Sequence, residues 1–251
     1  MFPKPESVSE EKRTVHNFFK TILILSSIAL VLLILYNYGR QIKPGDGRTS
    51  PTESAAPTEI VYPNFKSDVF KTVFERKYGK KTVSDIKAMR SLDLSNCELE
   101  DIRDIAMFTG LTTLVLNDNH IKDVTPLEKL YGLTVLNIGG NDITDINCLS
   151  HLTALTELNV RQNTIGSINV VANMPNLTNL TAYSCGLTDI SVLRSCPLLE
   201  HVSIGYYNDI TDISPLFDLP LLKEIKLKHL DIQDSQKDML KALFPNAVFE
   251  W

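Results

Sequence analysis

Apolar residues recur through most of the chain with a period of 22 residues. The units begin at seven positions: Met89, Leu111, Leu133, Leu155, Leu177, Leu199 and Leu222. Within a unit the pattern is L-x-x-L-x-L-x-x-N-x-I-x-x-I-x-x-L-x-x-L, and only the last interval lengthens to 23 residues. One such unit cannot bury its own apolar side chains, so the pattern predicts that the units stack.

The alternation at the start of each unit predicts a short strand whose leucines point inward. Side chains at the third, fifth and seventh positions then point outward, onto the concave face of a parallel sheet. The last ten residues of a unit, such as Lys122–Tyr131, are too few for a full helix and predict 3-10 pieces and turns on the convex side. The fold class is therefore an α/β leucine-rich-repeat solenoid, with six units over residues 89–221.

The ninth position of a unit is usually asparagine. Its side chain can hydrogen-bond buried backbone groups where the chain turns away from the strand. Cysteine replaces it at Cys97 and Cys185, and in the sixth unit it comes one residue late, at Asn208. The extra residue lies in Gly205–Asn208 and predicts a bulge there.

The two ends of a solenoid expose apolar layers and need caps. Residues 64–88 are expected to cap the first unit, with a helix from Lys66 to Tyr78, a stop at Gly79 and a short turn after Thr82. Residues 222–251 are expected to form a partial repeat and a second cap.

The second cap should contain a helix over Lys237–Phe244 and a terminal strand over Ala247–Trp251. The helix is expected to turn Met239, Leu240 and Leu243 toward the core. Because the array ends in such a cap, we expect the chain to be complete at this end.

One N-terminal segment differs from the rest of the chain. Residues 21–39 hold 19 residues without a charge, and a helix of that length spans roughly 28 Å, close to the hydrocarbon thickness of a bilayer. No small-residue cleavage site follows, so we expect one uncleaved transmembrane helix between a polar tail (1–20) and a disordered linker (40–63). Basic residues flank the segment on both sides, so they decide its orientation weakly; an extracellular repeat domain is favoured.

Composition and motifs narrow the function further. A net charge of −5 argues against a nucleic-acid partner. The sequence has no G-x-S-x-G, P-loop or H-E-x-x-H motif, and its histidines lack metal-ligand spacing. We therefore expect no enzymatic activity, no cofactor and no metal; a hydrolase hidden in a degenerate repeat is the least favoured alternative.

The four cysteines and a column of aspartates each have two competing interpretations. Cys97 and Cys185 lie four repeats apart, roughly 19 Å at strand spacing, which is too far for a disulfide. We interpret all four cysteines as small buried residues, although unpaired thiols also fit a reducing compartment.

The aspartates at the thirteenth position could form a calcium ladder, but capping of the convex turns is the favoured interpretation. They are Asp101, Asp123, Asp145, Asp189 and Asp212.

The region 62–251 resembles the internalin-type leucine-rich-repeat proteins of bacterial surfaces. The resemblance rests on the 22-residue unit, on segments such as Asp209–Leu216 (DITDISPL) and on the helical entry Ser67–Phe74 (SDVFKTVF). It implies a curved extracellular protein-binding module. Internalins usually carry longer arrays, an immunoglobulin-like domain and a cell-wall sorting signal, whereas here the anchor is N-terminal; host invasion is therefore not carried over.

The outward positions of units four to six are richer in aromatic and charged residues than the others. We take six of them as candidate ligand-binding residues: Glu157, Arg161, Tyr183, His201, Tyr206 and Tyr207. Arg161 and Tyr183 should be strand neighbours and form a cation–π contact. An ordinary solvated surface is the alternative.

These features together predict a membrane-anchored protein that binds a protein or peptide ligand on its concave face at the cell surface. The alternative is a cytoplasm-facing scaffold or regulator of an intracellular enzyme.

Overall fold

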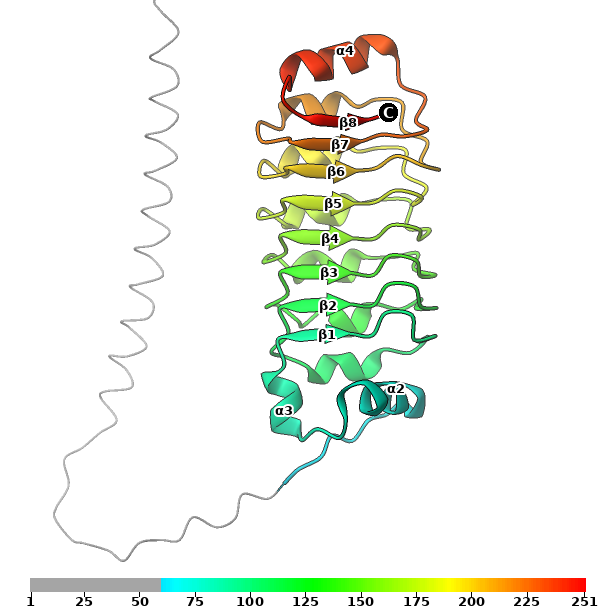
Figure 1. Ribbon diagram of the computed structural model, residues 1–251, viewed down its shortest axis with the longest axis vertical. Helices are drawn as coiled ribbons and strands as arrows, with labels where there is room; N and C mark the ends of the chain where they lie inside the picture. The colour runs from blue at the N-terminus through cyan, green and yellow to red at the C-terminus, as the bar shows by residue number, and fades with distance from the viewer. Residues whose placement is uncertain (1–59) are drawn as a thin grey trace, which may run out of the picture. The chain divides into compact units, whose positions relative to one another are not determined.

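Short parallel strands pair in chain order along one face of the protein (Figure 1). The computed structural model describes residues 60–251, and its register advances by one repeat per strand, so that Leu92 pairs with Leu114 and Leu114 with Leu136. The eight strands are β1 (Ser91–Asp93), β2 (Thr113–Val115), β3 (Val135–Asn137), β4 (Glu157–Asn159), β5 (Asn179–Thr181), β6 (His201–Ser203), β7 (Glu224–Lys226) and β8 (Val248–Glu250). The predicted parallel sheet is confirmed.

The convex side consists of 3-10 turns, as predicted. They are η1 (Arg103–Met107), η2 (Thr125–Leu127), η3 (Asn147–His151), η4 (Asn169–Asn173), η5 (Ser191–Ser195) and η6 (Ser214–Asp218). The aspartate column caps them: the Asp123 carboxylate accepts the Thr125 N–H at 2.8 Å, and its equivalents in other units do the same. Ser167 takes this role in the fourth unit.

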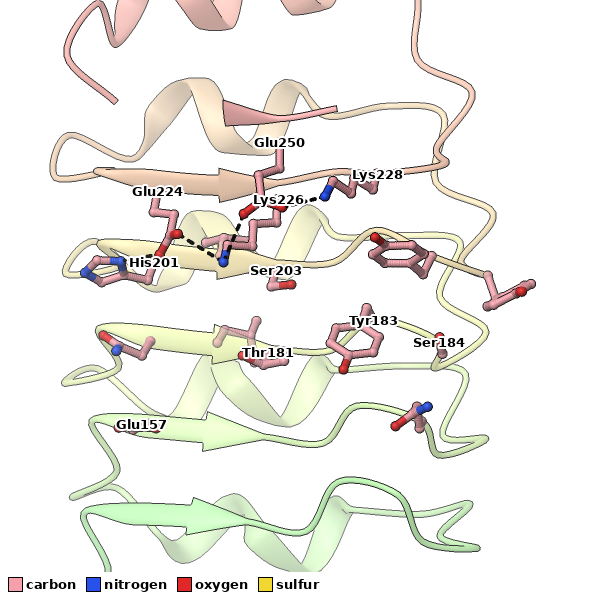
Figure 2. A pocket seen from close by; sticks show the side chains of 16 residues that line it. Glu157, Thr181, Tyr183, Ser184, His201, Ser203, Glu224, Lys226, Lys228 and Glu250 are labelled. Carbon is pink, nitrogen blue, oxygen red and sulfur yellow. Dashed lines mark hydrogen bonds and ion pairs between the residues drawn. The ribbon is translucent and has the colours of Figure 1, made fainter. Parts of the chain in front are cut away.

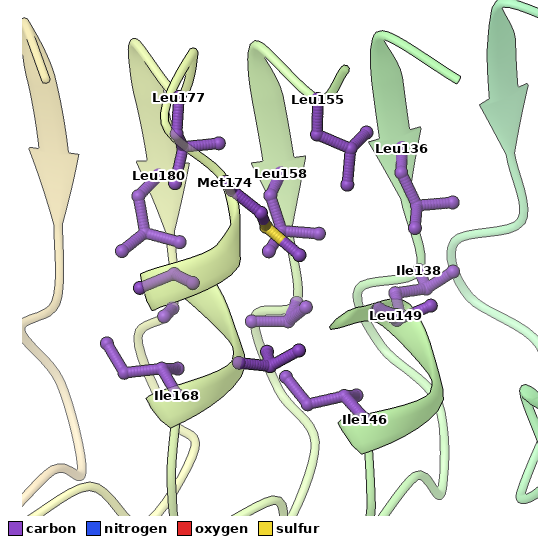
Figure 3. Close-up of a cluster of buried hydrophobic side chains, with 14 of the residues drawn as sticks. Leu136, Ile138, Ile146, Leu149, Leu155, Leu158, Ile168, Met174, Leu177 and Leu180 are labelled. Carbon is purple, nitrogen blue, oxygen red and sulfur yellow. The ribbon is translucent and has the colours of Figure 1, made fainter. Parts of the chain in front are cut away.

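The core is a continuous column of aliphatic side chains between sheet and convex turns. Figure 3 shows Leu136, Leu158 and Leu180 of successive strands facing Ile146 and Ile168, and all five are at most 3% exposed. Full burial of such a side chain stabilises the fold by about 1.5–3 kcal/mol. Each unit shares this burial with its neighbours, which explains why the period is so regular.

The ninth-position asparagines form a buried ladder, as predicted. Asn141 donates from Nδ2 to the carbonyls of Leu116 and Ile138 at 3.1 and 3.0 Å, and its Oδ1 accepts the Ile121 N–H at 3.0 Å. Asn119, Asn163 and Asn208 repeat the pattern. Each asparagine therefore joins two adjacent units through backbone groups that lie out of reach of water.

The N-terminal cap is a pair of helices. Helix α2 (Asp68–Tyr78) begins two residues later than predicted, because the Ser67 hydroxyl caps it by accepting the Phe70 N–H. Gly79, at φ +72°, ends it as predicted, and α3 (Val83–Ala88) follows. The buried carboxylate of Asp104 accepts the N–H groups of Lys66 and Ser67, which ties the cap to the first unit.

The C-terminal cap differs from its prediction in detail. Helix α4 (Asp234–Leu243) starts three residues earlier than expected and buries Leu240, but Met239 and Leu243 are 51% and 46% exposed. The prediction that these two point inward is wrong. The Gln236 side chain accepts the Ile213 N–H and donates to the carbonyl of Thr211, so the stripe of Gln236 and Leu240 faces the core.

The prediction that all four cysteines are buried is also wrong for two of them. Cys185 and Cys196 are buried, and Cys97 and Cys148 are only partly so; all four are free thiols. Cys97 lies in the first unit, where no preceding repeat covers it, and Cys148 lies in the turn η3 rather than at a core position. Burial raises the pKa of Cys185 and of Cys196 to about 11.

The predicted polar tail (1–20), transmembrane helix (21–39) and most of the linker (40–63) lie outside the described residues. Among residues 60–251, no helix has the length and apolar character needed to cross a bilayer.

Candidate functional site

The concave face carries a hollow of about 770 Å³ above strands β4 to β8 (Figure 2). Its floor is made by small polar side chains such as Thr181 and Ser203, which project from the fifth position of their units. Larger side chains surround this floor: Glu157, His201 and Glu224 at the start of the strands, and Tyr183 and its neighbours at their ends. The hollow therefore has a polar floor, a charged end and an aromatic end.

The aromatic end is a continuous ladder of three rings. Tyr183 meets Tyr206 edge-on with centroids 5.9 Å apart, and Tyr206 meets His229 at 4.8 Å. Tyr207 stands beside this aromatic ladder and is 87% exposed. Rings held by one another lose little conformational freedom when a ligand packs on them, which is typical of binding hot spots.

The backbone beneath the aromatic ladder is strained. The eighth position of every unit has positive φ, and its occupants are Asn96, Asp118, Gly140, Gln162, Ser184, Tyr206 and His229. Asparagine, aspartate and glycine tolerate this conformation, whereas a bulky ring does not favour it. In the sixth unit both Tyr206 (φ 41°) and the inserted Tyr207 (φ 53°) adopt it, which confirms the predicted bulge. Strain of this kind concentrates at functional sites.

Gly205 makes this bulge possible. A Cβ atom at Gly205 would lie 2.5 Å from the Lys228 carbonyl oxygen. That same carbonyl accepts the Tyr206 N–H at 2.6 Å, and the Tyr206 carbonyl accepts the Ser184 N–H at 2.7 Å. Close backbone approach at Gly205 therefore fixes where both tyrosine rings stand.

A network of four charges lines the hollow along β7 and β8. Lys226 Nζ lies 3.1 Å from carboxylate oxygens of both Glu224 and Glu250, and Lys228 Nζ lies 2.9 Å from Glu250. Hydrogen bonds from Lys226 and then His201 hold the pKa of Glu224 below its usual value, and Lys228 and Lys226 do the same for Glu250. This ion-pair network is neutral in sum and shapes the hollow without giving it a net charge.

The charged end of the hollow contains one carboxylate outside that network. His201 Nδ1 lies 3.1 Å from Glu224, and the Lys223–Glu200 pair, 2.6 Å apart, does not line the hollow. Glu157 is exposed on β4, two strands from His201, and forms no ion pair within residues 60–251. It supplies the uncompensated negative charge of the hollow.

Five of the six predicted ligand residues line the hollow, and one does not. Glu157, Tyr183, His201, Tyr206 and Tyr207 contribute to its walls. Arg161 turns away from them.

The predicted cation–π contact between Arg161 and Tyr183 is not formed among the described residues. The Arg161 guanidinium instead bonds the Gln162 side chain and lies 3.5 Å from Asp118, two repeats back. The Arg161 side chain can reach Asp118 because position seven of the intervening unit is Gly139, where a Cβ would lie 2.7 Å from Arg161 Cγ.

Sequence reasoning missed the ion-pair network. The alternation E-I-K-L-K over 224–228 already places Glu224, Lys226 and Lys228 on the outward positions, and this run of charges was a usable signal. The role of Glu250 had no such signal, because it depends on β8 pairing parallel to β7 with Lys226 opposite Glu250.

Comparisons with known proteins agree with this architecture. The family description "Leucine rich repeat" matches residues 109–165, and "Leucine Rich repeats (2 copies)" matches residues 87–129. No curated protein matches the sequence.

Solved structures of internalins from Listeria monocytogenes are similar in fold. InlF has a TM-score of 0.64 at 27% identity over 72% of this chain, and internalin C2 a TM-score of 0.64 at 26% over 74%. The functional domain of InlJ, which includes a cysteine ladder, has a TM-score of 0.59 at 22% identity over 74% of this chain and shows the fold alone.

The match spans 54% of the InlF chain, 83% of the internalin C2 chain and 45% of the InlJ chain. The chain thus contains leucine-rich repeats and is structurally similar to Listeria internalins.

Proposed function

We propose that this protein is a membrane-anchored binding protein that holds a protein or peptide ligand in its concave hollow, outside the cell. The observation that carries the proposal is the aromatic ladder at the strand ends, where Tyr206 and Tyr207 stand on strained backbone beside Tyr183. The exposed Tyr207 ring adds little packing and stands on left-handed backbone, so a ligand-binding role explains it better than packing does.

The surroundings of the aromatic ladder also suit a ligand. Repeat proteins use their concave faces as extended binding surfaces, and small polar residues such as Thr181 and Ser203 leave room for a chain above the sheet. The similarity to internalins supports the same assignment. Fold alone does not name a ligand, so the assignment rests on the hollow.

The membrane anchor and the location rest on the N-terminal sequence. Residues 21–39 carry no charge and are followed by a linker rich in proline, serine and threonine. A helix over these residues would hold the repeat domain at the bilayer, and the linker would keep the hollow accessible.

Site-specific photocrosslinking tests the ligand site. The full chain would carry a benzophenone amino acid at Thr181 in the hollow or, as a control, at Lys129 on the exposed convex side. We expect a protein adduct from Thr181 that is lost when Tyr183→Ala is added. The same adduct from Lys129, or persistence without the Tyr183 ring, would reject the concave site.

The location needs its own test, because four free thiols favour the cytoplasm-facing scaffold as a second candidate. Protease treatment of intact cells distinguishes the two orientations. Loss of the repeat domain supports the cell-surface assignment, and full protection with cleavage only after lysis supports the cytoplasmic scaffold.

A further inference from the structure

The charges that line the hollow are not balanced. Glu224, Lys226, Glu250 and Lys228 compensate one another within the ion-pair network. Glu157 is left over, exposed and without an ion-pair partner among residues 60–251. A ligand that fits the hollow therefore gains by bringing one positive charge to this end, and a ligand that brings a negative charge meets repulsion there.

The distance between the two ends of the hollow sets a second requirement. Glu157 lies on β4 at the third position of its unit, and Tyr183 follows the adjacent strand β5 at the seventh position of the next unit. Four residues of extended chain cover about 13 Å, so the two ends are separated by about that distance along the strands. An extended peptide that lies along the strands reaches both ends with side chains about four residues apart.

We infer that the ligand is an extended peptide segment with a basic side chain at Glu157 and an aromatic or large apolar side chain on the aromatic ladder. This inference rests on the proposed function and adds the chemical class of the ligand. The small floor residues Thr181 and Ser203 leave the peptide backbone room to lie between the two ends (Figure 2).

Synthetic peptides test the inference directly. The probes are fluorescein-labelled glycine–serine dodecapeptides that carry one arginine and one tryptophan separated by three residues, in both orders. In matched probes, glutamate or serine replaces the arginine. Fluorescence anisotropy would measure their affinity for the full chain in detergent micelles. We expect an arginine–tryptophan probe to bind most tightly and the glutamate–tryptophan probes most weakly.

Two variants locate the contacts. Glu157→Gln should weaken binding of the arginine–tryptophan probe about two- to fivefold, the range for an exposed ion pair, and should leave the serine probe unchanged. Glu75→Gln on helix α2 removes the same charge away from the hollow and should change neither affinity. Tyr183→Ala should weaken binding of the arginine–tryptophan and the serine–tryptophan probes at least about fivefold each.

The outcomes separate this inference from the proposed function. Equal affinity for the arginine and glutamate probes, no effect of Glu157→Gln, or no binding by any probe overturns the inference. If the Thr181 crosslink forms in those cases and depends on the Tyr183 ring, the concave site stands and only the ligand class is wrong. If that crosslink also fails, both are wrong.

Discussion

The regular half of the solenoid (residues 111–176) and its elaborated half (residues 177–251) share one core and present different concave faces. Their inward positions are equally buried: Leu136 and Leu180 are both at most 1% exposed. The asparagine ladder is unbroken in the regular half, whereas Cys185 interrupts it in the other. The inserted Tyr207, the aromatic ladder and the ion-pair network belong to the elaborated half.

This difference shows where the stack constrains the sequence. Inward positions must match the neighbouring units, so they keep the period through both halves. Side chains at outward positions and at position eight are not part of the core, so their identity can vary while the backbone of the turn keeps its bonds to the next unit. Apart from Glu157 of β4, the proposed binding features gather in the half where the turn has departed from the period. We therefore expect stability and ligand binding to be largely separable along the molecule.

The largest effect should come from breaking the asparagine ladder in the regular half. Asn141→Ala leaves the buried Ile121 N–H without its partner and removes one of two amide donors from each of the Leu116 and Ile138 carbonyls, which keep the bonds from Asn119 and Asn163. We expect the free energy of unfolding to fall by about 3 kcal/mol, because one buried N–H without a partner costs about 1–3 kcal/mol and each of the two other lost hydrogen bonds about 1 kcal/mol. Urea denaturation of the full chain in micelles measures this loss. Asn173→Ala on the exposed convex side is the control, and an equal loss there would refute the ladder's role.

Two glycines distinguish backbone strain from steric contact. Gly140 and Gly166 have nearly equal φ, +64° and +65°, but a Cβ at Gly140 would lie 2.3 Å from Asp118 Oδ1, and nothing lies within 4 Å of one at Gly166. Gly166→Ala should destabilise the fold by about 1 kcal/mol, the cost of left-handed backbone. Gly140→Ala should cost about 2 kcal/mol, because Asp118 must also move.

Thermal or urea unfolding of both variants measures the difference. Gly140→Ala should also raise the proteolytic sensitivity of the Arg161 region, because Asp118 holds the Arg161 guanidinium. Equal losses in the two variants would mean that Asp118 moves without cost.

A single substitution at Cys185 should restore the asparagine ladder in the elaborated half. Its sulfur contacts the Val160 carbonyl at 3.2 Å, in the place where an asparagine amide would donate. Cys185→Asn should raise the free energy of unfolding by about 1 kcal/mol, the usual net contribution of a hydrogen bond. No gain, or a loss, in urea denaturation would show that the elaborated half no longer accommodates the ladder.

The same substitution should change the response to alkaline pH. Burial raises the pKa of Cys185 from 9.0 to about 11. Between these values the unfolded chain has released a thiol proton that the folded chain retains, so stability falls as the pH rises from 9 to 11. Cys185→Asn should make this fall shallower. Cys196→Ala provides a comparison, because its thiol pKa is raised to about 11 as well.

Most of the fold followed from the sequence because its determinants are local. The strands, the convex turns and the bonds of Asn141 depend on one repeat and its copy, and the period reveals both. The direction of Arg161 depends on Gly139 in one neighbouring unit and Asp118 in the next, and no repeat pattern encodes that combination. The rotation of α4 likewise depends on the polar contacts of Gln236.

The candidate site could be predicted only in part for the same reason. Outward alternation identified the surface and its tyrosines, but the left-handed backbone at position eight is a property of the folded turn. The pairing of Glu250 with Lys226 requires the register of β8, which lies outside the repeat period.

The smallest effect on stability should come from deleting Tyr207. The deletion joins Tyr206 to Asn208 and restores the 22-residue spacing of the other units. Because Asn208 would keep its bonds to Ala182 and Ile204, and one left-handed tyrosine is removed, we expect unfolding to change by less than about 1 kcal/mol. If Tyr207 serves binding, the Thr181 photocrosslink should weaken while the unfolding midpoint stays in place. A large loss of stability would mean instead that the inserted residue belongs to the packing of the elaborated half. Stability and ligand binding would then not be separable at the turn that carries Tyr206 and Tyr207.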